Sequence, residues 1–516
     1  MSQSNDENML DRLSREASET GLRLLQGRSG VVIDAALLGT LPVEWVRTNE
    51  ILPVRCNGVP SALIGSANKV GLLDYVTLMV GQSLEPVLAP ADVLTACIED
   101  AYAQRQESPS ELIAAMHIAD QAPVRRGDDL LLSSRDAPVT QLINTIMLDA
   151  LRQRASDIHF EPFASRLRVR FRIDGVLYEQ SAPPGHLVAS LVSRLKVMAH
   201  MDIAERRLPQ DGMARVRAGD REIDVRVSTV PVAEGERVVL RLLDQSHTVL
   251  EMSSLGMADD CLEQLRMQLR QPNGMVIVSG PTGSGKTTTL YAALGALDAE
   301  RRNIMTIEDP IEYQLDNIGQ IQVKPKIGIN FATGLRHILR QDPDVILVGE
   351  TRDAETAEIA VRAALTGHLV FTTLHTNDAP GALVRLADIG IAPYLLSACV
   401  RGVLAQRLVR CLCPHCRQPY TVNAANELSA RIAGKQAWQA SGCEHCKQGY
   451  WGRTGVFEFL QMSESLREVV RDPAFHLERV RQEALGGGMC PLEEDGLQKV
   501  LAGITTLEEV ERAAAV

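Results

Sequence analysis

The sequence predicts an α/β protein of several domains, built around a mostly parallel sheet flanked by helices. Its 516 residues exceed what one hydrophobic core usually supports, so two to four domains are expected. Hydrophobic residues make up 45% and charged residues 23%, as in ordinary globular proteins, and 4% aromatic residues imply mainly aliphatic cores. Short β-branched runs alternate with helical stretches from residue 249 onward, as in parallel sheets: Met275 to Val278, Asn303 to Ile307, Val345 to Val348 and Leu369 to Thr373.

Composition divides the chain into four segments. Residues 1–120 read as a small α/β domain for partner docking, and residues 121–138 (QAPVRRGDDLLLSSRDAP) have the composition of a linker. Residues 139–245 predict a second α/β domain, in which RLRVRFRIDGVLYE alternates around an Asp174-Gly175 turn. Residues 246–516 are expected to form the large domain, with a cysteine-rich insertion at about 410–455 and a helical tail.

The net charge of −12 argues against a general nucleic-acid binder, because such binding rests on a positive surface. The first residues, MSQSNDENMLDRLSRE, are polar, and no stretch approaches the roughly 20 apolar residues that span a bilayer. We therefore expect a cytoplasmic chain whose membrane contact goes through partners.

The segment MVIVSGPTGSGKTTTLYAAL carries the pattern GxxxxGKT between an apolar strand and a helix, which is the context of a phosphate-binding P-loop. Glycines let backbone N–H groups face the β-phosphate, Lys286 supplies charge near the β- and γ-phosphates, and the Thr287 hydroxyl can ligate Mg²⁺. The predicted nucleotide-binding residues are Gly280, Pro281, Thr282, Gly283, Ser284, Gly285, Lys286, Thr287 and Thr288.

Acidic residues at strand ends are the catalytic candidates, because ligands bind at the carboxyl edge of such sheets. Glu350 follows the strand of DPDVILVGE, whereas Asp344 precedes it, and roughly 20 Å of strand prevents both from reaching one Mg²⁺. We expect Glu350 to polarise the attacking water or to hold a water of the Mg²⁺ shell, the alternative being a solvated loop acid. Glu308 and Asp309 leave TIEDP in the same way and are further candidates.

Two histidines flank the strand LVFTTL. His375 follows it, where an imidazole could sense the γ-phosphate, and a structural histidine is the alternative. His368 precedes the strand and is expected to orient a loop.

Four cysteines form two CxxC pairs separated by 26 residues, in CLCPHC and SGCEHC. This spacing predicts a closed structural zinc site of Cys413, Cys416, Cys443 and Cys446, since disulfides are disfavoured in the cytoplasm. His415 and His445 are alternative ligands inside the pairs, and the neighbouring Cys411 is the main ambiguity.

Several arginines are candidates for neutralising phosphate charge, some across a subunit boundary: Arg226, Arg241, Arg336 and Arg340. Asp157, His159 and Glu161 alternate on one strand, where a hydrogen-bonded polar edge is favoured over a metal site. Arg168, Arg170 and Arg172 also share a strand face, which is either solvated or docks on an acidic neighbour.

Together the segments RLPQDG, DVRVSTVP, GPTGSGKTTTLY, TIEDPIEY, LRQDPDVILVGETRD, GHLVFTTLHTND and the CxxC pairs resemble the secretion ATPase superfamily over residues 130–459. The stretch LEPVLAPADVLTACIEDAY is similar to the N-terminal domain of GspE-type type II secretion ATPases. One departure is Met213, where the family often has Arg after QDG.

The resemblance implies a RecA-like P-loop core, a PAS-like α/β N-terminal half and a small zinc subdomain. It implies a homo-hexamer using ATP, Mg²⁺ and Zn²⁺, held by a GspL-type inner-membrane anchor through its N-terminal domain and coupled to a GspF-type platform, with acidic phospholipid as a further contact. Hydrolysis would drive pseudopilus assembly. On the family pattern Glu350 is the Walker B acid, Glu308 and Asp309 belong to the Asp box, and His368 and His375 to the His box.

Three other functions stay open from the sequence. A type IV pilus extension ATPase would share the catalytic half and the cysteines, although its N-terminal region is usually longer. A nucleic-acid translocase is disfavoured by the acidic charge, and a scaffold without turnover is disfavoured by Glu350 beside an intact P-loop.

Overall fold

The computed structural model describes residues 17, 20–25, 27–28, 30–38, 46, 49–80, 82–104, 136–164, 166–180, 183, 185–218, 221–244 and 250–514. The chain divides into two compact units, Met1–Asp149 and Ala150–Val516. The division falls within helix α7, Asp136–Arg152. Most of the predicted linker, residues 121–135, lies outside the described residues.

The first unit contains a five-stranded sheet in the order β1-β5-β4-β3-β2. Strands β3 and β4 form a hairpin whose turn, Asn57-Gly58, has positive φ at both residues, as a two-residue hairpin turn requires. Buried aliphatic residues from this sheet and its helices make one core. The elements are β1 Arg23–Leu24, β2 Val31–Val32, α2 Ala35–Leu38, β3 Ile51–Cys56, β4 Val59–Ile64, η1 Ala67–Leu72, α4 Leu73–Val80, β5 Glu85–Leu88 and α5 Ala91–Gln104.

The second unit begins with a six-stranded antiparallel sheet in the order β8-β7-β6-β11-β10-β9. Strand β7 alternates buried and half-buried residues, and the predicted turn after it, Asp174-Gly175, has positive φ at both positions. The elements are β6 Asp157–Pro162, β7 Leu167–Ile173, β8 Val176–Glu179, η2 Gly185–Leu187, α8 Val188–Met198, β9 Gln210–Ala218, β10 Arg221–Val232 and β11 Gly235–Asp244.

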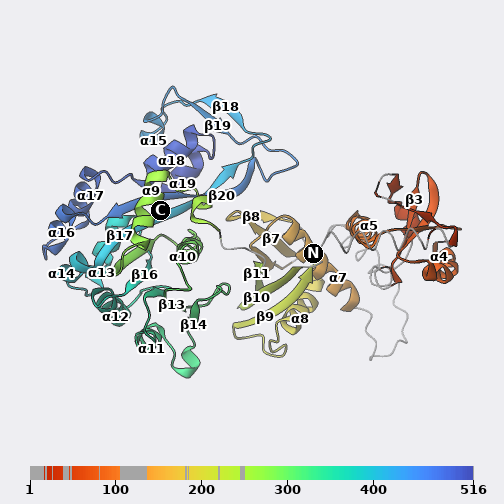
Figure 1. The fold of residues 1–516 in the computed structure, drawn as a ribbon, viewed down its shortest axis with the longest axis horizontal. Coiled ribbons are helices and arrows are strands. Elements are labelled where there is room, and N and C mark those ends of the chain that lie inside the picture. The colour runs from red at the N-terminus through yellow and green to blue at the C-terminus, as the bar shows by residue number, and fades with distance from the viewer. Residues whose placement is uncertain are drawn as a thin grey trace. The chain divides into compact units, whose positions relative to one another are not determined.

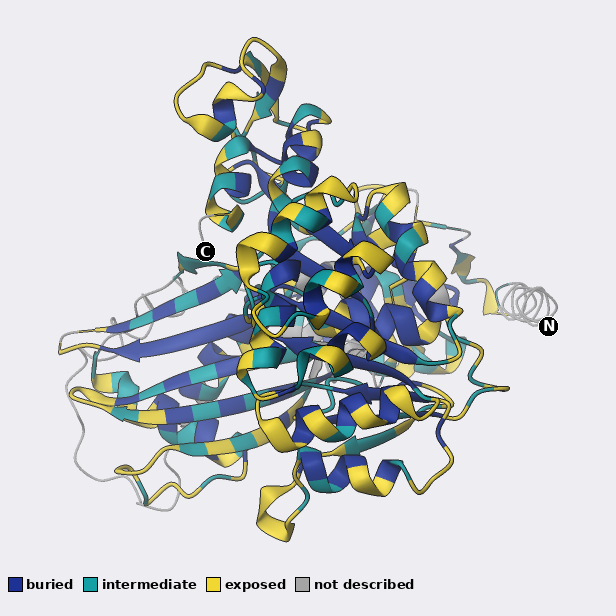
Figure 2. Cartoon of the chain, turned by 90° about the vertical axis from the view of Figure 1, so that its left-hand side faces the viewer, coloured by how far each residue is buried: buried dark blue, intermediate teal, exposed yellow. Residues whose placement is uncertain are grey.

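The large domain is a seven-stranded sheet in the order β14-β13-β15-β16-β12-β17-β20, parallel except for β20 (Figure 1). Alternate residues of β12 pack on opposite layers: Met275 and Ile277 join the core under α11 to α14, and Val276 and Val278 join the core under α9 and α10. Every residue of this strand is therefore buried, as the continuous apolar run predicted. Figure 2 shows buried strands crossing the middle of the view behind helices whose outer faces are exposed.

The sheet strands of the large domain are β12 Gly274–Ser279, β13 Ile304–Glu308, β14 Gly319–Gln322, β15 Val345–Val348, β16 Leu369–Leu374, β17 Val400–Leu412 and β20 Tyr450–Gln461. Its helices are η3 Met252–Leu255, α9 Asp259–Leu269, α10 Lys286–Gly295, η4 Pro325–Ile327, α11 Phe331–Ile338, α12 Ala354–Leu365, α13 Ala379–Asp388 and α14 Pro393–Cys399, then α16 Glu464–Arg471, α17 Leu477–Gly486, α18 Leu492–Leu501 and α19 Leu507–Ala514. The insertion between β17 and β20 adds β18 Gln418–Thr421, α15 Glu427–Ala430 and β19 Gln436–Gln439.

The antiparallel sheet and the large domain are in direct contact. The Gly452 N–H donates a hydrogen bond of 2.9 Å to the carboxylate of Asp174, which lies in the turn after β7. The Arg154 guanidinium lies 3.8 Å from the centre of the Trp451 ring, which is cation–π distance.

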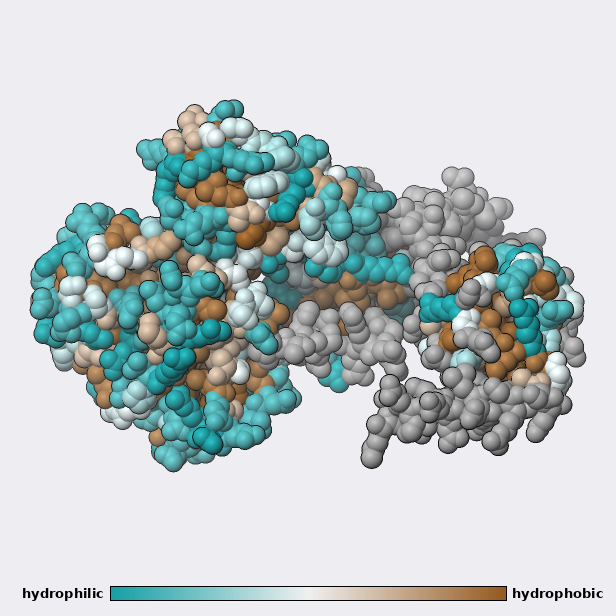
Figure 3. Space-filling model, turned by 45° about the horizontal axis from the view of Figure 1, so that its top comes forward, coloured by the Kyte–Doolittle hydropathy of each residue, from teal (hydrophilic) through white to brown (hydrophobic). Residues whose placement is uncertain are grey.

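The exposed surface in Figure 3 carries hydrophobic residues in small patches among hydrophilic ones. Among the described residues, no helix is both long and apolar enough to span a membrane.

Candidate nucleotide-binding and metal sites

The predicted P-loop joins the end of β12 to the start of α10. Gly280, Gly283 and Gly285 have φ values of 149°, 80° and 86°, which side chains disfavour. A Cβ on Gly280 would lie 2.5 Å from the Gln406 carbonyl oxygen, so the loop packs directly on β17. The loop then opens a helix, whose N-terminal N–H groups favour a phosphate.

Lys286 is folded back on its own loop. Its Nζ donates hydrogen bonds of 2.7 Å and 3.0 Å to the carbonyls of Gly280 and Pro281. Burial, followed by the charge of Arg407, lowers the pKa of Lys286 to about 8, while Glu350 acts in the opposite direction. Thr287 and Thr288 are exposed beside it.

Glu350 and His375 meet at the same sheet edge. They follow β15 and β16, and β16 is hydrogen-bonded to the P-loop strand β12. A Glu350 carboxylate oxygen lies 3.9 Å from His375 Nε2 and 2.7 Å from Arg352 Nη2. Burial and the nearby Lys286 lower the pKa of His375, so its imidazole is neutral at neutral pH.

Glu308 and Asp309 have different surroundings. The Glu308 carboxylate is buried and accepts hydrogen bonds from the hydroxyls of Tyr291 and Thr306 and from the Gln320 amide. Burial and then the Glu308 charge raise the pKa of Tyr291, which therefore donates at neutral pH. Asp309 is exposed and free to face solvent.

The candidate arginines lie in two places. Arg226 donates to the Ile311 carbonyl at 3.3 Å, and with Arg241 and Met213 it lines a cavity of about 430 Å³. Arg336 on α11 pairs with Glu355. Arg340, in the turn after α11, donates to the Arg336 carbonyl and lies beside His337.

The alternating acidic residues of β6 are paired with arginines, but β6 is a buried interior strand between β7 and β11, not the strand edge that was expected. Asp157 pairs with Arg241 and Arg172, and Glu161 pairs with Arg168, Arg170 and Arg237. The three arginines of β7 thus pair with the acidic residues of the neighbouring strand β6. Elsewhere, Nδ1 of His368 lies 2.9 Å from the Ala363 carbonyl, consistent with its predicted role of orienting a loop.

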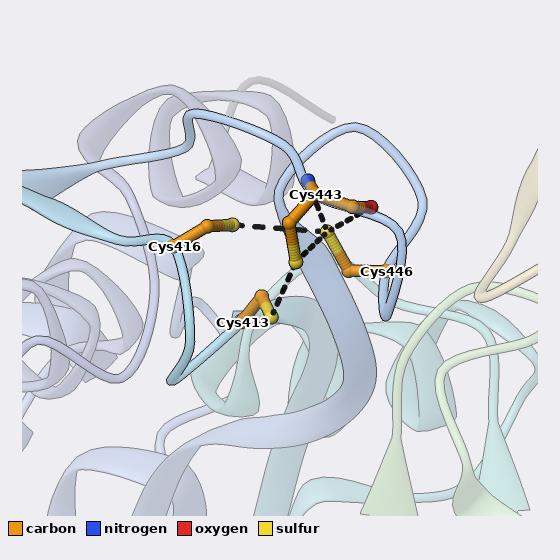
Figure 4. A group of neighbouring side chains, drawn as sticks. All are labelled: Cys413, Cys416, Cys443 and Cys446. Carbon is orange, nitrogen blue, oxygen red and sulfur yellow. Dashed lines mark hydrogen bonds between the residues drawn. The ribbon is translucent and has the colours of Figure 1, made fainter.

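The four predicted cysteines gather into one group (Figure 4), and it is the only potential metal cluster among the described residues. Sulfur separations are 3.9 Å for Cys413 and Cys443, 3.7 Å for Cys416 and Cys446, and 3.6 Å for Cys443 and Cys446. Four sulfurs each about 2.3 Å from a tetrahedral zinc would be about 3.8 Å apart, so these thiols fit a zinc ion. Cys411, His415 and His445 are outside the group.

A family model, Type II/IV secretion system protein, matches residues 133–512. The chain belongs to this family. It is 55% identical over 387 residues to "Type II secretion system protein E" of Dickeya dadantii, covering 75% of this chain and 77% of the relative. The protein of that name from Aeromonas hydrophila is 50% identical over 488 residues, covering 92% and 97%.

Further likenesses extend beyond type II secretion. The chain is 42% identical over 493 residues to "Type IV pilus assembly ATPase PilB" of Myxococcus xanthus, covering 93% of this chain and 86% of the relative. The solved structure of the Legionella pneumophila ATPase DotB matches with a TM-score of 0.55 at 22% identity, covering 72% and 95%, which supports the fold. The family and the fold class predicted from the sequence are thus confirmed.

Two residues beside the P-loop were not predicted from the sequence. Gln406 and Arg407 lie on β17, and the Gln406 amide donates to the Ser284 carbonyl at 2.6 Å. Their segment, RGVLAQRLVRCL, reads as an ordinary buried strand with occasional arginines. Only the pairing of β17 with β12 brings these two residues next to the P-loop, and no local sequence pattern predicts that pairing.

Proposed function

We propose that the chain is the ATPase of a type II secretion system, a homo-hexameric motor that drives pseudopilus assembly through an inner-membrane platform. One observation carries the proposal: a chain of this family holds a P-loop, Glu350 and His375 at one sheet edge. It is an ATP-hydrolysing enzyme whose reaction depends mainly on positioning and charge stabilisation.

We infer roles for these residues from their chemistry. P-loop N–H groups and Lys286 would hold the phosphates, and the Thr287 hydroxyl would hold Mg²⁺, which neutralises phosphate charge. Glu350 would orient the attacking water, and the neutral His375 would donate or accept one hydrogen bond as the γ-phosphate leaves. Asp309, which follows β13, would face the nucleotide together with Glu350 and His375. Glu308 would position Asp309 through its hydrogen bond to Tyr291.

The arginines would complete the site from other surfaces. Arg226 and Arg241 face the cavity beside the large domain. Arg336 on α11 and Arg340 just after it are exposed, so a neighbouring subunit's nucleotide could meet them. A site shared between subunits is incomplete in one chain, so low activity is expected for the isolated protomer.

The remaining assignments also follow the domain order. Residues 1–120 would dock on a GspL-type anchor, and residues 139–245 would close on the nucleotide. The GspF-type platform would receive the resulting motion. The motor would lie at the cytoplasmic face of the inner membrane, with acidic phospholipid nearby. Four thiolates leave no open position on zinc, so the metal would stabilise the insertion and take no part in hydrolysis.

Pilus extension is the second candidate, because the likeness to PilB covers 93% of the chain. The likeness to the type II proteins is higher, at 50% over a similar span, and favours secretion. A nucleic-acid translocase remains disfavoured by the net charge of −12.

ATP turnover of the full chain tests the proposal, with the anchor's cytoplasmic domain and acidic phospholipid vesicles added in turn. Glu350→Gln should abolish turnover, and the matched control Glu358→Gln, an exposed acid on α12 paired with Arg362, should leave it unchanged. Stimulation by the anchor domain supports secretion. Stimulation by DNA alone would contradict it.

A further inference from the structure

Arg407 is a buried cation without an acidic partner. The residue is 5% exposed, and its Nη atoms donate to the carbonyls of Gln406 at 3.1 Å and Asn377 at 2.8 Å. Within the described part of the chain, no carboxylate forms an ion pair with Arg407, and its buried Nε has no hydrogen-bond partner. Buried arginines are nearly always paired, because an uncompensated buried charge is costly.

On one side of Arg407 lies the P-loop. Gln406, the preceding residue, donates to the Ser284 carbonyl, and its own carbonyl would meet a Cβ on Gly280. Among the described side chains, the buried Gln406 Oε1 and Ser284 Oγ also lack a partner. Three orphaned polar atoms therefore lie around this junction, where polar groups are normally satisfied.

On the other side lies the turn that follows β16. Asn377, whose carbonyl accepts from Arg407, is two residues after His375. The same turn is tied to β12, because the Thr376 N–H donates to Ser279 Oγ at 3.2 Å. Arg407 thus ties the turn after His375 to β17, the strand whose Gln406 is hydrogen-bonded to the P-loop.

We propose that Arg407 is a positioning residue whose buried charge is balanced by the polyphosphate of a bound nucleotide, acting through the P-loop and Lys286. Its bond to Asn377 holds the His375 turn against the loop, so phosphate occupancy and the position of His375 are coupled. This inference rests on the proposed nucleotide site.

The charges around Arg407 agree with this assignment. Burial lowers the pKa of Arg407, and the negative charges of the more distant Glu458 and Asp378 only partly oppose this decrease. Asp378 already pairs with Arg481, and Glu458 accepts backbone N–H groups of Ala379 and Leu492. The positive charge of Arg407 in turn lowers the pKa of Lys286, which a phosphate would relieve.

The test is Arg407→Met in the full chain, which keeps the volume and removes the charge. Thermal unfolding without nucleotide should be unchanged or shifted upward, because a costly buried charge is lost. Binding of Mg·ADP, followed by fluorescence of a labelled analogue, should weaken about tenfold, or about 1.4 kcal/mol. Arg407→Lys, which keeps the charge but not the planar fork, should return the affinity to within about threefold.

The matched control is Arg410→Met on the same strand, because Arg410 has the acidic partner that Arg407 lacks, Glu509 at 2.8 Å. This control should lower the unfolding temperature and leave Mg·ADP affinity unchanged. A second readout is the pH dependence of Mg·ADP affinity. In Arg407→Met its alkaline decline should move to higher pH, since the charge of Arg407 no longer lowers the pKa of Lys286, while burial and Glu350 still act on it.

A variant Arg407→Met that unfolds, or that binds Mg·ADP with wild-type affinity and an unmoved pH profile, overturns the inference while leaving the proposed function standing. Failure of the wild-type chain to bind Mg·ADP would overturn the proposed function, and this inference with it.

Discussion

The alkaline limit of nucleotide binding should be set by Lys286. With a pKa of about 8, the amine is protonated in roughly three quarters of molecules at pH 7.5 and in roughly one tenth at pH 9. If only the charged amine binds phosphate tightly, the apparent Kd for Mg·ADP should rise about eightfold over this interval. The nucleotide phosphates are already ionised throughout it, so the change belongs to the protein.

The assay is a titration of a fluorescent ADP analogue at constant ionic strength, because screening also alters such affinities. Lys286→Arg is the control: its guanidinium stays charged, so its affinity, whatever its absolute value, should be flat from pH 7.5 to 9. A wild-type affinity that is equally flat would refute the reasoning from burial and from the Arg407 charge.

Three further predictions concern the supports of the two sites. Cys446→Ser should reduce the zinc that survives dialysis, measured by elemental analysis, and lower the unfolding temperature; an undiminished zinc content would contradict the four-thiolate site. Gly280→Ala should destabilise the fold by about 1–3 kcal/mol and abolish ADP binding, because its Cβ would meet the Gln406 carbonyl at 2.5 Å; retained binding would count against it. Tyr291→Phe should cost about 1–3 kcal/mol in denaturant unfolding by removing a buried donor to Glu308, whereas an unchanged midpoint would show that this donor is dispensable.

The sequence predicted the parts of the site that local patterns encode. Apolar runs located β12, β15 and β16, and because parallel strands end at one edge, Glu350 and His375 could be expected beside the P-loop. The two CxxC pairs likewise located the cysteine cluster, since each pair is a local turn.

Other features depend on tertiary pairing that no local pattern carries. The neighbour of β12 on its far side is β17, more than 100 residues later, and this pairing alone places Gln406 and Arg407 under the loop. Glu308 illustrates a related limit: its position at a strand end made it a candidate for orienting water or metal, but Tyr291 and Gln320 hydrogen-bond to its buried carboxylate. A side chain's partners follow from packing, not from its place at a strand end.

The measurement that tests the central claim most directly is secretion itself. In a bacterium lacking its own type II secretion protein E but carrying the rest of the cognate system, the wild-type chain should restore export of a type II substrate to the medium. Glu350→Gln, present at equal abundance, should not. Restoration of pilus extension without any exported substrate, or export supported equally by Glu350→Gln, would contradict an ATP-driven type II secretion motor.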